Sequence, residues 1–61
     1  MFETYYNQLM AMKKAEIARQ GAIWGVISGR QSNLDYMVKN YTKTQLARFI
    51  ADRMTWLGSH S

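Results

Sequence analysis

The amino-acid sequence predicts an all-α fold in which a long helix is followed by two shorter ones, within a single domain over residues 1–61. The chain contains no proline, so no residue compels a break in a helix. Residues that favour helix, such as Ala, Leu, Met, Lys, Gln and Arg, are abundant. The large apolar residues recur at the period of an amphipathic helix and not at that of a strand. A chain of 61 residues has room for one domain only.

The first helix is predicted over residues 2–28, because its large apolar residues gather on one broad face. These residues are Phe2, Tyr5, Tyr6, Leu9, Met10, Met12, Ile17, Ile23, Trp24 and Ile27. Gly29 followed by Arg30 is typical of the end of a helix, where glycine adopts the left-handed conformation. Gly21 or Gly25 provides an alternative, earlier end, since glycine disfavours helix by about 1 kcal/mol relative to alanine.

Two shorter helices are predicted over residues 33–41 and 43–57. Each begins near a hydroxyl residue that has an acidic or amide residue three positions later, which is the arrangement of a capping box. These pairs are Ser32 with Asp35 and Thr42 with Gln45. An apolar stripe follows in each helix, made of Leu34, Met37, Val38 and Tyr41 in the first and of Leu46, Phe49, Ile50, Met54 and Leu57 in the second. Gly58 is expected to end the last helix.

The chain is small and basic. It has 8 Lys and Arg residues against 4 Asp and Glu residues, and its formal net charge is +4. The cations are spread along the sequence, which favours anionic partners only mildly. No segment approaches the roughly 18 to 20 consecutive apolar residues of a membrane span, and the first residues lack the features of a signal peptide. We therefore expect a cytoplasmic protein.

Neither catalysis nor metal binding is predicted. The sequence has no cysteine, and its one histidine, His60, has no acidic cluster at ligand spacing. The four acidic residues are scattered along the chain, and no serine lies in the motif of an activated nucleophile. We therefore expect a non-enzymatic protein that has no cofactor and no small-molecule substrate.

A homodimer is predicted from the length of the first helix. A domain of this size buries only roughly 60% of its unfolded surface, and without disulfides or a metal it needs tight packing or oligomerisation. A helix of about 27 residues is ~40 Å long, too long for one small chain to cover on both faces. Small residues recur every seven positions opposite the bulky face, and we expect this seam to be the interface of a twofold dimer. The predicted interface consists of Thr4, Ala11, Ala15, Ala18, Ala22 and Gly25.

Two features of the first helix have alternative interpretations. The alanines of the seam are good helix formers, and its glycines are caps or a hinge if the seam has no function. Lys13, Glu16 and Gln20 interrupt the bulky face. They form either an exposed waist between two apolar patches or, in an antiparallel dimer, a Lys13–Glu16 pair between chains. The sequence leaves the direction of the dimer open.

DNA binding through a helix-turn-helix is the alternative function. The helices over 33–41 and 43–57 are joined by a very short turn. The start of the second helix exposes residues suited to base and phosphate contacts, Lys43, Thr44, Gln45 and Arg48, which form the candidate nucleic-acid or partner surface. Tyr36 and Lys39 fit poorly at positions that a helix-turn-helix packs. We therefore rank protein binding first and DNA binding second.

In general character the chain resembles the small accessory proteins of temperate bacteriophages, including those encoded in the early exo-xis region of lambdoid phages. It is short, predicted to be helical, free of cysteine and rich in Met, Tyr and Trp. The resemblance covers the whole chain but no motif, so it assigns no role to any residue. It implies a non-enzymatic regulator that binds host or phage macromolecules. Peripheral membrane binding by the first helix is a weaker alternative, because its polar side is largely Ala and Gly.

Overall fold

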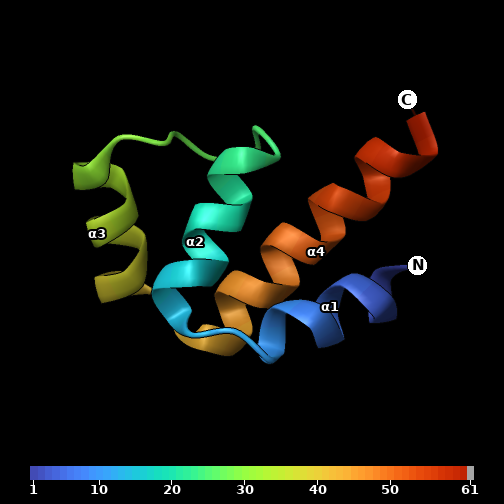
Figure 1. Ribbon diagram of the computed structural model, residues 1–61, viewed down its shortest axis with the longest axis horizontal. Coiled ribbons are helices and arrows are strands. Elements are labelled where there is room, and N and C mark those ends of the chain that lie inside the picture. Colours follow the sequence, from blue (N-terminus) through green and yellow to red (C-terminus); the bar gives the residue numbers. More distant parts are fainter. Residues whose placement is uncertain (61) are drawn as a thin grey trace.

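Over residues 1–60, which the computed structural model describes, the chain forms four helices (Figure 1). They are α1 (Phe2–Met10), α2 (Lys14–Ile23), α3 (Gln31–Asn40) and α4 (Lys43–His60). This part of the chain contains no strand, which confirms the predicted all-α class. Side chains are described as far as residue 59. None of the helices in this range is long and apolar enough to span a membrane.

Helix α4 is the centre of the fold, because it supplies most of the buried side chains. Its inner face carries the buried residues Leu46, Ala47, Ile50, Ala51 and Met54. Leu9 of α1 and Ile17 of α2 complete the core cluster. Helix α1 runs antiparallel to α4 (Figure 1), so that Met1 and Tyr5 lie beside Gly58. Helix α2 packs on α4 from the other side, and α3 lies outermost, mainly against α2 (Figure 1).

The start of α4 confirms the predicted capping box. The backbone N–H of Gln45 donates to Thr42 Oγ1 at 3.1 Å, and the backbone N–H of Thr42 donates to Gln45 Oε1 at 2.9 Å. Two donors that a helix start leaves unpaired are thereby satisfied. Because both partners are only three residues apart, this signal is local and could be predicted from the sequence.

The helix predicted over residues 2–28 is divided in the structure, which corrects that boundary. Helix α1 ends at Met10, and Ala11, Met12 and Lys13 connect it to α2. No glycine or proline lies at the break, so the cause is tertiary: folding α1 back onto α4 buries its apolar face within the same chain. Lys13, at the N-cap of α2, and Glu16 are exposed, so the interruption that they make in the bulky face marks the division between two short helices.

The end of α2 also differs from the prediction, and its cause is local. Gly25 has φ +76°, the left-handed conformation that other residues adopt with difficulty. The N–H of Val26 donates to the carbonyl of Gly21 at 2.8 Å, and that of Gly25 donates to Ala22 at 3.0 Å. This pattern is a Schellman motif, which ends the helix at Ile23. Of the three glycines at which the helix could end, Gly21, Gly25 and Gly29, it is therefore Gly25 that ends it.

Helix α3 begins two residues earlier than expected. Its N-cap is Arg30 and not Ser32. Ser28 organises this start instead: its Oγ accepts from the Arg30 N–H at 3.3 Å, and its carbonyl accepts from Asn33 Nδ2 at 3.0 Å. Asp35, the expected partner of Ser32, accepts a 2.9 Å hydrogen bond from Gln31 Nε2. Local hydrogen bonds of this kind shift a helix boundary without changing the fold.

Gly21 permits a close approach of α2 to α4. A Cβ atom built on Gly21 would lie 2.8 Å from Ile50 Cδ1, 3.2 Å from Ile50 Cγ1 and 3.3 Å from Ile27 Cγ1. The first distance is shorter than a carbon–carbon contact allows. Small residues in the first half of the chain therefore do bring helices together, but the helices belong to the same molecule.

Candidate functional site

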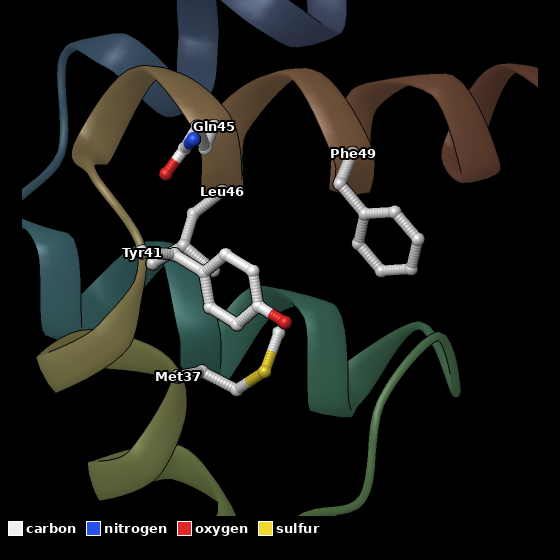
Figure 2. A pocket seen from close by; sticks show the side chains of 5 residues that line it. All are labelled: Met37, Tyr41, Gln45, Leu46 and Phe49. Atoms are coloured by element: carbon white, nitrogen blue, oxygen red, sulfur yellow. The ribbon is translucent and has the colours of Figure 1, made fainter.

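A shallow apolar groove lies where the end of α3 meets the start of α4. Its volume is about 240 Å³, and it is lined by Met37, Tyr41, Gln45, Leu46 and Phe49. Figure 2 shows the Tyr41 ring reaching across Leu46 from the turn, with Met37 on one side and the ring of Phe49 standing apart on the other. We call this feature the aromatic groove. It is smaller than the ~300 to 1,000 Å³ typical of small-molecule sites.

The turn between α3 and α4 positions the Tyr41 side of the groove. Tyr41 is the C-cap of α3 and has extended backbone angles, φ −123° and ψ 149°, which lead the chain away from the helix axis. Its ring packs edge-on against Tyr36 at 6.4 Å between centroids. The capping box of Thr42 and Gln45 then fixes the first turn of α4, one turn before Phe49. The groove is thus held by local bonds within a short segment.

Aromatic side chains remain exposed in and around the groove. The exposed fraction is 40% for Tyr41, 48% for Phe49 and 57% for Tyr36. Trp56, two turns beyond Phe49 along α4, is 49% exposed. Single exposed apolar residues are ordinary, whereas a continuous group of large ones is typical of a binding surface. The group here is concentrated on α3, α4 and the turn between them.

Positive charge lies beside this aromatic surface. The Arg53 guanidinium lies 5.6 Å from the centroid of the Trp56 ring, a cation–π geometry. Arg53 follows Phe49 by four residues and therefore lies on the same side of α4. Lys39 is an exposed cation in the last turn of α3. An apolar partner that carries acidic side chains would meet complementary charge at Arg53, beside the exposed aromatic side chains of α4.

The predicted nucleic-acid or partner surface is placed together at the start of α4. Thr44, Gln45 and Arg48 are exposed, and Lys43 is half-buried. Gln45 is engaged in the capping box, so its amide oxygen already accepts a hydrogen bond from the Thr42 N–H. At ~100° per residue Arg48 lies about 100° around the helix from Phe49. This basic surface and the aromatic groove therefore lie on neighbouring sides of α4 and share Gln45.

The predicted dimer seam is not one continuous face in the structure. Thr4 lies on α1, Ala11 in the linker, and Gly25 beyond the end of α2. The remaining three members are the alanines of α2, Ala15, Ala18 and Ala22. Ala18 has 0% of its surface exposed because it is buried within its own chain, so it is not available to a second molecule. The linker at residues 11–13 separates Thr4 on α1 from the alanines on α2.

Tyr41 and Phe49 are predicted to lie on the apolar stripes of the last two helices, but both are exposed in the structure, which corrects the interpretation that these stripes are buried. Both satisfy the spacing of an apolar helix face, yet both lie at its edge and remain exposed. Around α4, Phe49 lies about 60° from Leu46 and about 100° from Ile50, and this angular position indicates that Phe49 is at the edge of the apolar face. In the part of the chain that the structure describes, no group of His, Cys, Asp or Glu residues is arranged to hold a metal ion.

Comparisons of the chain with protein-family models, curated proteins and solved structures gave no match. Function is therefore inferred from the groove and its surroundings.

Proposed function

We propose that this chain is a non-enzymatic regulatory protein that binds an amphipathic helix of another protein in the aromatic groove. The observation that carries the proposal is the exposure of Tyr41 and Phe49 on the two sides of one apolar groove. Aromatic side chains that are partly buried and firmly positioned are frequent anchors of protein interfaces. Docking a partner covers apolar surface that is otherwise in contact with water.

The groove favours a helical partner for reasons of shape. A groove between two helices accepts the apolar stripe of a third helix, with anchors at i, i+3, i+4 and i+7. Its volume of about 240 Å³ accommodates side chains in preference to a whole small molecule. Arg53, one turn beyond Phe49 on α4, favours acidic residues beside that stripe. The proposed partner is therefore an amphipathic helix with Asp or Glu flanking its apolar face.

The homodimer, the cytoplasmic location and the phage origin predicted from the sequence remain parts of this proposal. A regulator of this kind changes the activity of its partner by occupying a helix that the partner uses elsewhere. In a dimer, two grooves would act on one assembly, and linked sites bind more tightly than either site alone.

DNA binding remains the second candidate because of the exposed residues at the start of α4. Lys43, Thr44 and Arg48 lie on its first two turns, where a recognition helix makes its contacts. Two observations favour protein binding over DNA binding. Helix α3 has no fully buried residue and packs mainly on α2, and an exposed Phe49 contributes nothing to phosphate contacts.

One capture experiment distinguishes the two candidates. Wild-type chain, Phe49→Ser and the double variant Lys43→Ala with Arg48→Ala are immobilised separately and exposed to a lysate of the source cells. Bound protein is measured by mass spectrometry and bound nucleic acid by sequencing. We expect a protein that binds the wild type and the double variant but is lost with Phe49→Ser. Nucleic acid that is lost only with the double variant would establish the DNA interpretation, and loss of neither would contradict both.

A further inference from the structure

We infer that the chain forms a dimer by exchanging α1 between two copies, with residues 11–13 straightening so that α1 and α2 become one helix. In the exchanged dimer, α1 of each copy lies on α4 of the other copy and makes the contacts that it now makes within its own chain. The partner for this surface of α4 is therefore a second copy of the chain. The inference concerns assembly and does not depend on what the aromatic groove binds.

The residues of the linker favour a continuous helix. Ala11, Met12 and Lys13 all have high helix propensity, and none is glycine or proline. Ala11 is already close to helical, with φ −78° and ψ −11°. Lys13 departs from helix through ψ alone, with φ −72° and ψ 156°. At Ala11 and Lys13, rotation about ψ of Lys13 is therefore the main change between the bent linker and the straight one.

Hydrogen bonding at the linker also favours a continuous helix. Lys13 occupies the N-cap of α2 but makes no side-chain cap hydrogen bond. Within residues 1–60, the backbone N–H groups of Lys14, Ala15 and Glu16 make no hydrogen bond to another backbone group, as at other helix starts. In a continuous helix the carbonyls of residues 10, 11 and 12 would accept from them. The contrast with the other end of α2 is sharp, because Gly25 and its Schellman motif hold that end in place.

A straightened first segment cannot remain on its own α4. The 9 residues of α1 and the 10 of α2, with the three linker residues, would make a helix about 33 Å long. The longest dimension of the whole folded chain is 30 Å. Helix α1 would thus project from the body with Leu9 uncovered, together with the residues that now pack on the core beside it, Phe2, Tyr5, Tyr6 and Met10. The matching face of α4 would be uncovered as well.

A second copy covers both surfaces at once, because each chain lacks what the other exposes. Because α1 makes the same contacts in the monomer and in the exchanged dimer, the equilibrium between these two forms depends on the linker and on protein concentration. Straightening gains hydrogen bonds at Lys14, Ala15 and Glu16, while association loses translational freedom. Short linkers between packed elements are a known route to exchanged dimers.

The decisive variant is Lys14→Pro, which suits the bent linker and opposes the straight one. Lys14 is the first residue of α2, where proline is well tolerated, and Lys13 before it already has the extended conformation that a following proline requires. In the middle of a continuous helix the same proline is strongly unfavourable. Light scattering should show a concentration-dependent dimer for wild type and for the control Lys14→Ala. Lys14→Pro should lower the dimer association constant by at least ~100-fold with helicity preserved.

Exchange is distinguished from a dimer of intact monomers by mixed isotope labelling. Labelled and unlabelled chains are unfolded, mixed and refolded, and contacts between the Tyr5 side chain and Gly58, which lie side by side in the folded chain, are measured by isotope-filtered nuclear Overhauser effects. Exchange places these contacts between chains. A chain that stays monomeric to millimolar concentration, or a dimer with these contacts within one chain, overturns the inference.

Should Lys14→Pro lose its helices, Lys13→Asn provides the same test, since asparagine caps α2 but is poor inside a helix. A dimer unaffected by Lys13→Asn also overturns the inference.

Discussion

Replacing Gly21 with alanine sets two physical effects of known size against each other. Alanine favours helix over glycine by about 1 kcal/mol. The added Cβ, however, would lie 2.8 Å from Cδ1 of Ile50, which is itself fully buried, and 3.2 Å from its Cγ1. Overpacking of a core typically lowers stability by about 1 to 3 kcal/mol. We therefore expect Gly21→Ala to lower the free energy of unfolding by about 1 kcal/mol, a fall of roughly 4 to 8 °C in Tm.

Gly58→Ala is the matched control, because Gly58 is helical and a Cβ there would lie 3.6 Å from its nearest neighbours, at ordinary contact distance. We expect this change to be neutral or stabilising. Urea unfolding of both variants, followed by circular dichroism, gives the comparison. Ile50→Val removes the nearest atom and should cost about 0.5 to 1.5 kcal/mol in wild type but less in the Gly21→Ala chain. If Gly21→Ala stabilises as much as Gly58→Ala and Ile50→Val costs the same in both backgrounds, α2 and α4 do not approach closely at this point.

Three further predictions follow from local geometry. Gly25→Ala should lower the free energy of unfolding by about 1 to 2 kcal/mol, and Gly25→Asn by less, because Gly25 has φ +76°; equal urea midpoints for the three chains would contradict this. Thr42→Ala should cost about 1 kcal/mol by removing the acceptor of the Gln45 N–H, whereas Thr42→Asn should be nearly neutral. Phe49→Ser should lower Tm by roughly 4 to 8 °C, since 48% of the residue is exposed and burial of the other half contributes about 1 kcal/mol, and a drop more than twice as large would mean that Phe49 is a core residue.

Features governed by neighbours in sequence could be predicted, and the start of α4 is the clearest example, whereas the predicted end at residue 57 is wrong because the helix continues through Gly58 to His60. Its capping box needs only Thr42 and Gln45, and its buried stripe needs only helical spacing. A very short turn before α4 was predicted from the same pattern, and it has two residues, Tyr41 and Thr42, because α3 ends at Asn40. The end of α2 was predicted only as one of several alternatives, because Gly21, Gly25 and Gly29 all have the residue type of a helix end. Only a structure shows that Gly25 has the positive φ.

The candidate site was harder to predict than the helices around it. Helical spacing assigns Tyr41 and Phe49 to apolar faces, but the exposure of an edge residue depends on which neighbour covers it. Helix α3 packs mainly on α2 and leaves the Phe49 side of α4 open. Docking of one helix on another is decided by contacts far apart in sequence, and a single sequence contains no direct record of them. Of the two basic residues predicted to be exposed at the start of α4, Arg48 is exposed and Lys43 is half-buried.

The division of the first helix is the feature for which local and tertiary preferences disagree. Local propensity at Ala11, Met12 and Lys13 favours a straight helix, and the folded monomer bends there only because α1 then covers α4. A second copy can supply the same cover while allowing the linker to follow its own preference. The free-energy difference between the bent and straight forms therefore excludes the α1–α4 contacts, which are common to both. It depends on a few hydrogen bonds, one uncapped helix start and the concentration of the protein, so single substitutions at Lys13 or Lys14 should be sufficient to shift it in either direction.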